Sequence, residues 1–174
     1  MRVSARLQVP VRSLAAKMKE SFLIAFLNSS VDAAYGASQI CCERRLGIGR
    51  KLTGFGLPLG LVIYMPAGTI AITLVTMYAA QAYSVADSPL WYVMAAFLTV
   101  ALQAATPPVA GVGLLSYMVI ITRLGIPLQA LTVAMVADIL FGFAVAAVDQ
   151  AMLQLELVLE ADRLKLLDRD VLKR

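Results

Sequence analysis

Four apolar stretches lie between Phe22 and Val158, and each is interrupted where a membrane-spanning helix would be expected to continue. The interruptions are small, polar or proline-containing, and they fall at Asn28-Ser29-Ser30, residues 64–69, residues 104–108 and residues 138–149. Broken backbone at membrane depth is tolerated only where it is buried in protein or lines a watery cavity. In carriers, such breaks form the sites for substrate and ions. The four interruptions are therefore the first places to look for function.

The lengths of the apolar runs predict which segments cross the membrane. A spanning helix needs about 20 apolar residues, whereas runs of about 10–14 are typical of re-entrant segments. Residues 13–45 hold two short runs around Asn28-Ser29-Ser30, which predicts a hairpin that enters and leaves on one side. Residues 52–84 predict one span broken near Tyr64, and residues 89–123 predict a second hairpin. Residues 128–160 predict a long last helix, followed by a charged cytoplasmic tail at 161–174.

Proline supports a break in the second hairpin. Pro107 and Pro108 lack backbone donors and restrict the residue before them, so a continuous helix through both is unfavourable. The first hairpin begins inside and the second begins outside, which is the inverted arrangement of many secondary transporters. We therefore predict an all-α membrane protein in which a re-entrant helical hairpin plus a broken transmembrane helix is repeated with inverted topology. Four ordinary helices with glycine and proline kinks remain the alternative, although such short spans fit a bilayer badly.

Composition supports a membrane protein. The chain of 174 residues is 60% hydrophobic and 15% charged, whereas a soluble domain has about 45–50% apolar and about 25% charged residues. Between Leu52 and Asp138 the only charged residues are Asp87 and Arg123. A soluble protein with a very apolar core is the less consistent alternative.

The positions of the basic residues predict an orientation. All of the 15 Lys and Arg residues except Arg123 fall in three groups, near the N-terminus, at residues 44–51 and at the C-terminus. The loop at residues 81–89 has none. Positive charge favours the cytoplasmic side, so we expect a cytoplasmic C-terminus in an inner membrane of bacterial type. Nucleic-acid binding is disfavoured because the basic groups flank apolar segments and lack interleaved aromatic residues.

The residue types disfavour an enzyme. The chain has no histidine, and no Ser-His, Cys-His or phosphate-loop arrangement is present. The adjacent residues Cys41 and Cys42 suit neither a structural disulfide nor a zinc site. We expect no enzymatic activity, no cofactor and no zinc site.

Four landmarks resemble the dicarboxylate/amino acid:cation symporter family. That family has a serine-rich first hairpin tip and then Leu-Pro-Leu-Gly leading to Asn-Met-Asp-Gly-Thr. Residues 21–30 here resemble the serine-rich tip, and Leu57-Pro58-Leu59-Gly60 is identical to the Leu-Pro-Leu-Gly motif. The counterpart of Asn-Met-Asp-Gly-Thr is one residue longer and reads Tyr64-Met65-Pro66-Ala67-Gly68-Thr69. Residues 105–113 resemble the second hairpin tip, and residues 124–128 resemble the turn that follows.

The resemblance covers only the C-terminal part of such a transporter. It implies that residues 1–174 form a single partial transport domain in a lipid bilayer. Its expected partners are a small-molecule substrate and either a homotrimer or a separate scaffold polypeptide.

The resemblance also implies a substrate site. Helix ends expose unpaired amides or carbonyls, which can receive a carboxylate or a cation. By position in the family motifs, the substrate-binding residues would be Ser29, Ser30, Thr69, Val109 and Asp149. A simple polar turn at Ser29-Ser30 remains the alternative.

The implied ion-binding residues are Gly60, Tyr64, Thr106 and Asp149, with Gly60 acting through its carbonyl. Tyr64 replaces the asparagine of the family, and the aspartate of the family falls at Pro66 or Ala67. Because a hard cation prefers oxygen ligands, this loss weakens at least one sodium site. The hydroxyl of Thr106 could equally cap a half-helix.

Two carboxylates mark the last helix. Asp138 and Asp149 are 11 residues apart and share one helix face, and an ionisable residue at membrane depth is a functional candidate by default. If two residues are deleted relative to the family, Asp149 falls on an asparagine that touches substrate and sodium. Asp149 could bind a cation, carry a proton, pair with a cationic substrate, or simply be solvated near the cytoplasmic end.

The same alignment disfavours an acidic substrate. The substrate-pairing arginine of the family falls on Val145, the aspartate before it falls on Gly142, and the second sodium-binding aspartate falls on Leu153. No arginine lies between Leu124 and Asp162, and a carboxylate side chain would normally need that bidentate partner. Glutamate and aspartate are therefore not the expected substrates.

We expect sodium- or proton-coupled symport of a small organic acid or amino acid, with residues 106–113 as a gate over the substrate. Two alternatives remain. One is a truncated or degenerate homologue without transport activity. The other is a small membrane adaptor that docks to a larger transporter through its apolar surface.

Overall fold

A computed structural model describes residues 7, 9–85, 88–105 and 113–173. This part of the chain is helical, which confirms the all-α prediction, and its only β feature is an isolated bridge between Ile48 and Leu167. The helices are α2 (Val11–Asn28), α3 (Tyr35–Ile40), α4 (Arg50–Ile63), α5 (Pro66–Ala82), α6 (Pro89–Ala105), α7 (Gly113–Arg123), α8 (Ala130–Arg163) and α9 (Arg169–Lys173), with a 3₁₀ turn at Asp32–Ala34 and a π-helical segment at Cys41–Arg45.

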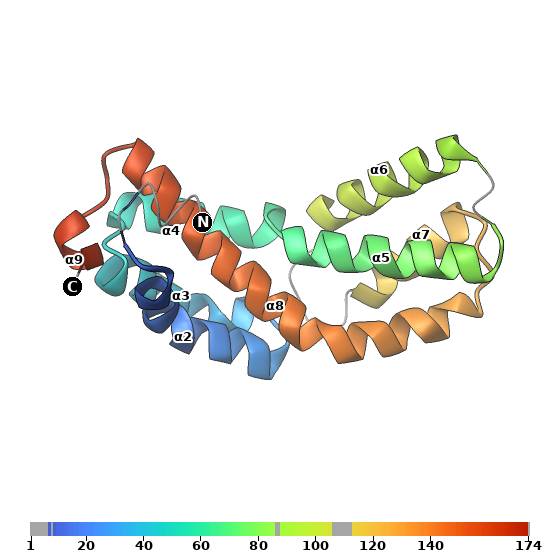
Figure 1. Cartoon of the computed structure of the whole chain (residues 1–174), viewed down its shortest axis with the longest axis horizontal. Helices are drawn as coiled ribbons and strands as arrows, with labels where there is room; N and C mark the ends of the chain where they lie inside the picture. The colour runs from blue at the N-terminus through green and yellow to red at the C-terminus, as the bar shows by residue number, and fades with distance from the viewer. Residues whose placement is uncertain (1–6, 8, 86–87, 106–112, 174) are drawn as a thin grey trace.

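The helices form two lobes joined by α8, which runs through both (Figure 1). One lobe packs α2, α4 and the C-terminal half of α8 around a buried cluster that includes Leu57, Leu157 and Val158. The other packs α5, α6, α7 and the N-terminal half of α8 around a cluster that includes Ile120 and Ala134. The segments between the lobes are therefore the place where the two halves of the chain meet.

The first hairpin reverses at the predicted position. Helix α2 ends because Ser29 adopts a left-handed conformation with φ 48° and ψ 37°. The amide of Ser30 then donates to the carbonyl of Ala25 at 3.2 Å, a bond that satisfies a free carbonyl of the last turn. The chain returns through the 3₁₀ turn and α3.

The predicted break in the first long span lies between α4 and α5. Tyr64 and Met65 both leave helical geometry, with φ angles of −111° and −127°. Pro66 accounts for Met65, because proline disfavours helical geometry at the residue before it. Pro66 itself begins α5, a position where its missing N–H costs nothing and its fixed φ suits the helix. The chain thus offers the exposed amides of a helix start inside an apolar segment.

Helices α6 and α7 occupy the region in which the second hairpin is expected. The indole N–H of Trp91, near the start of α6, donates to the carbonyl of Leu124 at 3.2 Å, just after α7. The expected tip, with Thr106, Pro107, Pro108 and Val109, lies outside the described residues.

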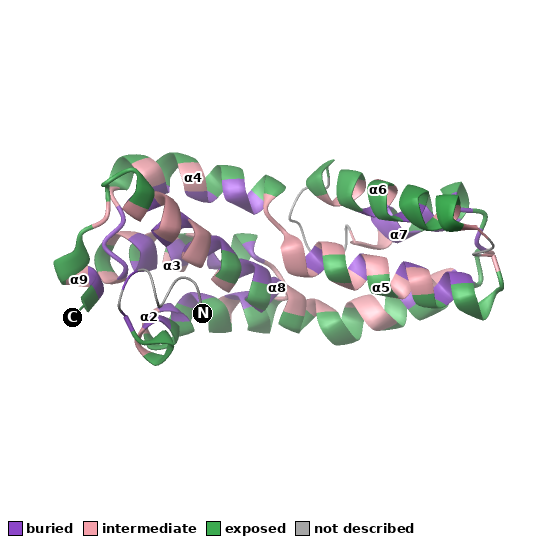
Figure 2. Ribbon diagram, turned by 45° about the horizontal axis from the view of Figure 1, so that its top comes forward, coloured by how far each residue is buried: buried purple, intermediate pink, exposed green. Residues whose placement is uncertain are grey.

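Two helical segments are long and apolar enough to cross a bilayer. They are Arg50–Ala82, in which α4 and α5 follow each other, and α8. The most apolar 18-residue stretches within them have mean hydropathies of 1.8 and 2.3. Exposed residues occur along the helices of both lobes (Figure 2). Many of them are large and apolar, among them Phe97 at 75% exposure and Leu27 at 70%. Such an outer surface suits lipid and would be unfavourable in water.

The segment after α8 is packed against the protein. The amide of Gly49 donates to the carbonyl of Leu166 at 3.0 Å, and the amide of Asp168 donates to the carbonyl of Gly47 at 2.8 Å. Leu172 is 1% exposed. The charged segment at 161–174 is thereby attached to the loop between the first hairpin and α4.

Candidate functional site

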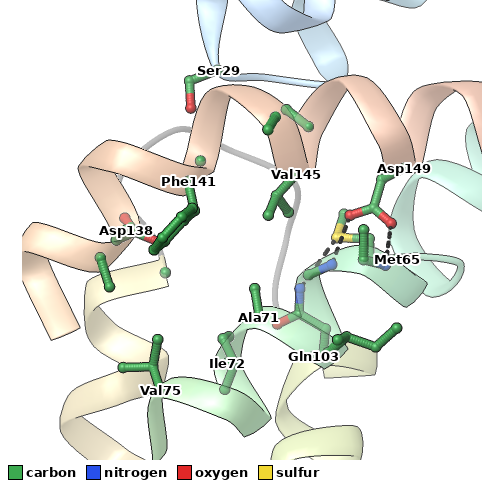
Figure 3. A pocket seen from close by; sticks show the side chains of 18 of the residues that line it. Ser29, Met65, Ala71, Ile72, Val75, Gln103, Asp138, Phe141, Val145 and Asp149 are labelled. Atoms are coloured by element: carbon green, nitrogen blue, oxygen red, sulfur yellow. Dashed lines mark hydrogen bonds between the residues drawn. The ribbon is translucent and has the colours of Figure 1, made fainter.

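A pocket of about 470 Å³ lies where the lobes meet (Figure 3). Its wall is formed by the Ser29 reversal, the break at Met65, the end of α6, the start of α7 and the middle of α8. Helix ends from both halves of the chain therefore border one space. Pockets of this size and shape are typical of small-molecule sites.

The pocket is mostly apolar and carries negative charge. Side chains such as Ile72, Phe141 and Val145 line it, and its two charged residues in the described part of the chain are Asp138 and Asp149. No Lys or Arg occurs among the described lining residues. The cavity is therefore better suited to a ligand with a positive group than to a dianion.

At one end of the pocket, the Asp149 carboxylate caps α5. Its Oδ1 accepts the amide of Ala67 at 2.7 Å and its Oδ2 accepts the amide of Gly68 at 3.0 Å. Asp149 is only 4% exposed. A carboxylate at a helix N-terminus satisfies free donors and interacts favourably with the helix dipole. The side chain of Met65, the N-cap residue of α5, forms no capping hydrogen bond. The Asp149 side chain of α8 caps the helix instead.

At the other end of the pocket, the Asp138 carboxylate lies against the first residue of α7. A Cβ added to Gly113 would come within 2.7 Å of Asp138 Oδ1, so only glycine leaves this space. Asp138 is half-buried. Among the residues that the structure describes, none forms a hydrogen bond or an ion pair with its carboxylate.

The two serines of the first tip play different parts. Ser29 Oγ approaches α8 so closely that a Cβ at Gly142 would lie 2.9 Å from it. Ser30 Oγ instead accepts the amide of Ala33 at 3.4 Å and so caps the 3₁₀ turn. Both residues line the pocket, but Ser29 is the one in contact with the central helix.

Of the residues proposed from sequence, the structure brings Ser29, Ser30 and Asp149 to the pocket. Thr69 is not among the described lining residues, and its hydroxyl donates to the carbonyl of Met65 at 2.9 Å. Thr106 and Val109 lie outside the described residues.

Gly60 has a packing role in this structure. A Cβ at Gly60 would collide with the side chain of Leu153. Its carbonyl accepts the amide of Tyr64 at 2.8 Å, and the Tyr64 side chain packs against the buried cluster of the first lobe.

The pocket also contains residues that are missing from the sequence-based site. Gln103 lies at the end of α6, and its side-chain nitrogen is 3.8 Å from the sulfur of Met65. Asp138, which the sequence marked as a functional candidate but assigned to no site, also lines the pocket. Gly113 and Gly142 could not be recognised from the sequence, because their role is only to leave room for side chains of other segments. For Gln103, a polar residue just before the proline-containing interruption was the only hint.

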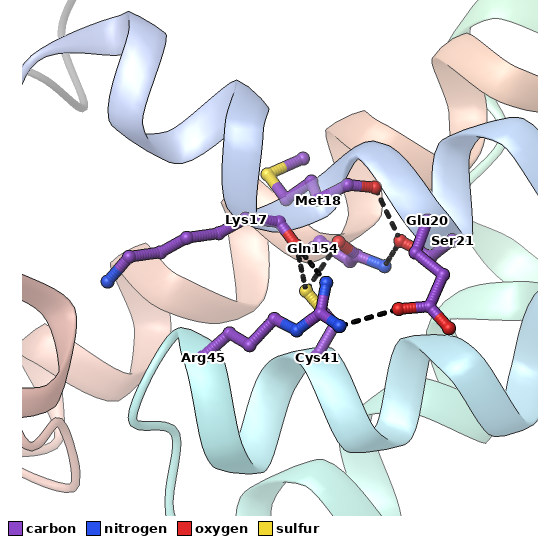
Figure 4. A network of polar contacts seen from close by, with 7 residues as sticks. All are labelled: Lys17, Met18, Glu20, Ser21, Cys41, Arg45 and Gln154. Carbon is purple, nitrogen blue, oxygen red and sulfur yellow. Dashed lines mark hydrogen bonds and ion pairs between the residues drawn. The ribbon is translucent and has the colours of Figure 1, made fainter. Parts of the chain in front are cut away.

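Buried polar contacts fix the first hairpin to α8 (Figure 4). Gln154 donates to Ser21 Oγ at 2.7 Å, Ser21 Oγ donates to the carbonyl of Met18 at 2.9 Å, and Cys41 Sγ lies 3.6 Å from Gln154 Oε1. Gln154 is fully buried. Buried polar groups joined in this way favour one arrangement of the helices that carry them.

A sequence model of the sodium:dicarboxylate symporter family matches residues 2–151 of the 174-residue chain. No curated protein matches. The chain belongs to the sodium:dicarboxylate symporter family, and hence to a family of membrane transporters rather than enzymes.

Proposed function

We propose that this member of the family binds a small amino acid in the pocket and moves it across the membrane by symport with sodium or a proton. The observation that carries the proposal is the half-buried Asp138 carboxylate, which lines the pocket with no partner among the described residues. An ionisable group at this depth needs a counter-charge. The ammonium group of a substrate would supply one.

The charges of the pocket favour an amino acid over an organic acid. An ammonium donates three hydrogen bonds and would pair with Asp138. A dicarboxylate would bring two negative groups to a wall whose described charges are both negative. Asp138 also lies one helical turn before Gly142, the position at which the family alignment expected an aspartate. A neutral amino acid is therefore the substrate class that we propose.

The arrangement of helix ends supports a carrier mechanism. We propose that the Ser29 and residue 106–113 tips are re-entrant from opposite sides, with the C-terminus cytoplasmic, and that the second tip closes over bound substrate. Ser29 would hold the polar end of the substrate, and the apolar wall at Ile72 and Val145 would exclude water. Symport then requires that ion and substrate each favour the bound state of the other.

The test is uptake by proteoliposomes that contain the full chain. Labelled serine, alanine and succinate are offered under a sodium gradient, a proton gradient, or neither. We expect uptake of serine or alanine, but not succinate, under one of the gradients, and a loss of at least about tenfold in Asp138→Asn, the value of one charge-assisted hydrogen bond. Asp170→Asn is the matched control, because Asp170 is exposed in α9 and is not a pocket-lining residue.

Each alternative predicts a different result. No uptake, together with no substrate-induced rise in melting temperature, would support the degenerate homologue. Stable co-purification with a larger membrane transporter would support the adaptor. Succinate uptake that survives Asp138→Asn would contradict the proposed substrate class.

A further inference from the structure

We propose that Asp149 is a positioning residue: its carboxylate holds the start of α5 at the break and does not bind a sodium ion there. The inference refines the coupling part of the proposed function, because it removes one candidate ion site from the pocket. It rests on the hydrogen bonds around the break.

The free amides at the start of α5 are all accounted for. Pro66 has no N–H, Ala67 and Gly68 donate to the two oxygens of Asp149, and Thr69 donates to the carbonyl of Met65 at 3.0 Å. Both carboxylate oxygens therefore face positive backbone groups. The partial positive charge at the N-terminus of α5, about half a unit, offsets part of the negative charge of Asp149. A cation is therefore less needed to neutralise this carboxylate.

Two backbone oxygens beside the cap already accept hydrogen bonds. The carbonyl of Gly60 accepts the amide of Tyr64, and the carbonyl of Met65 accepts both the amide and the hydroxyl of Thr69. A hard cation requires several free oxygen ligands, with carboxylates foremost. Within the described ranges, no group of three or more acidic, histidine or cysteine side chains could hold a metal. Asp149, whose two oxygens are both engaged by amides, is therefore a poor sodium ligand.

The residues around the cap agree with this role. The amide of Ala67 is bonded to Asp149, so an acidic side chain at position 67 would lie close to that carboxylate. Two such carboxylates repel unless a cation lies between them. Gly68 leaves room for the cap, because a Cβ there would collide with Gln103 and lie 3.3 Å from Asp149 Oδ2.

The experiment measures the melting temperature of the detergent-solubilised full chain in sodium chloride and in choline chloride at equal ionic strength. Four proteins are compared: wild type, Asp149→Asn, Ala67→Asp and Asp138→Asn. The amide side chain of Asp149→Asn keeps the shape of the carboxylate but offers one acceptor oxygen for two amides. Ala67→Asp places a second carboxylate close to Asp149. Asp138→Asn removes a charge from the same helix and the same pocket, where no amide in the described part of the chain depends on it.

We expect wild type to melt at the same temperature in both salts. Asp149→Asn should melt about 2–4 °C lower in both, and Asp138→Asn should stay within about 1 °C of wild type. Ala67→Asp should melt lower in choline and regain stability in sodium. A sodium response of wild type that survives Asp149→Asn would also support the inference, because the ion then binds elsewhere.

A sodium-induced rise in wild type that disappears in Asp149→Asn would overturn the inference. If Ala67→Asp does not fold, the comparison of wild type with Asp149→Asn still decides. No substrate is present in any arm, so failure of serine uptake and failure of this inference are observed separately.

Discussion

The two carboxylates of α8 lie at opposite ends of one pocket and have opposite surroundings. Asp149 is buried, and both of its oxygens are bonded to the start of α5. Asp138 is half-buried beside the start of α7, with no bonding partner in the described part of the chain. Two identical side chains on one helix face thus have different roles. Asp149 caps a helix, whereas the Asp138 carboxylate remains available for a ligand.

The packing around the two ends of the pocket also differs: it is tight near Asp149 and open near Asp138. Around Asp149, α8 is held by Gly60 against Leu153 and by the buried Gln154. Around Asp138, the wall is made of helix ends and exposed residues such as Phe141. The first end resembles a protein core, and the second resembles a binding surface.

The largest expected effect comes from removing the cap. Asp149→Ala leaves the amides of Ala67 and Gly68 without partners, at about 1–3 kcal/mol for each buried group. We expect a loss of about 2–4 kcal/mol in the free energy of unfolding. Asp138→Ala should lose less than about 0.5 kcal/mol. Denaturant unfolding in micelles measures both, and equal losses would remove the distinction between the two ends.

The next effect tests the close packing near the cap. Gly60→Ala places a methyl group against Leu153 and should cost about 1–3 kcal/mol of stability, as overpacking does. Gly54→Ala is the control, because it lies in the same helix with open space around it, and it should be neutral or slightly stabilising. A Gly60→Ala protein as stable as Gly54→Ala would show that Leu153 yields without cost.

A coupled pair sharpens this second test. In the double variant Gly60→Ala with Leu153→Ala, the added methyl enters the space that the leucine leaves. The combined loss should therefore be smaller than the sum of the single losses, which a double-mutant cycle measures. Additive losses would mean that the two residues do not share a contact.

Sequence alone predicted the first two breaks but not their partners. The interruption expected at residues 138–149 was wrong, because α8 runs without a break from Ala130 to Arg163. Pro66 and Ser29-Ser30 act locally, so the break between α4 and α5 and the reversal after α2 follow from the conformations that these residues prefer. The 11-residue spacing put Asp138 and Asp149 on one face. Which of the two carboxylates forms hydrogen bonds with the N-terminus of a helix depends on how α5 and α7 pack against α8. This tertiary packing cannot be predicted from local sequence preferences.

The same limit explains the roles of the glycines. Gly60 was predicted as an ion ligand through its carbonyl, and that role stays a prediction. The structure shows that Leu153, far away in sequence, occupies the space beside it. Gly113 and Gly142 leave room for Asp138 and Ser29 in the same way. Close approach between distant segments is a tertiary property, so a glycine in the sequence indicates only that something comes near.

A third, smaller effect concerns the attachment of the first hairpin. Gln154→Leu keeps the volume but removes the partner of Ser21 and of Cys41. We expect a loss of about 1–2 kcal/mol in stability and faster maleimide labelling of Cys41, which is 3% exposed. Gln81→Leu, at an exposed position, should change neither. Unchanged labelling in Gln154→Leu would show that packing alone holds the hairpin.

The smallest effect separates stability from binding at the tip itself. Ser29 has a positive φ of 48°. Ser29→Gly relieves about 1–2 kcal/mol of left-handed strain but adds about 0.5–1 kcal/mol of backbone entropy cost, so it should raise stability by about 0.5–1 kcal/mol, whereas Ser29→Ala keeps the strain. Both remove the hydroxyl that lies against Gly142 at the pocket wall. Both should therefore weaken serine binding by about two- to tenfold, the value of one hydrogen bond. Ser30→Ala removes only the cap on Ala33 and should leave binding within about twofold. If Ser29→Gly binds serine as tightly as wild type does, the Ser29 hydroxyl does not touch the substrate, and recognition would rest on the Asp138 end alone.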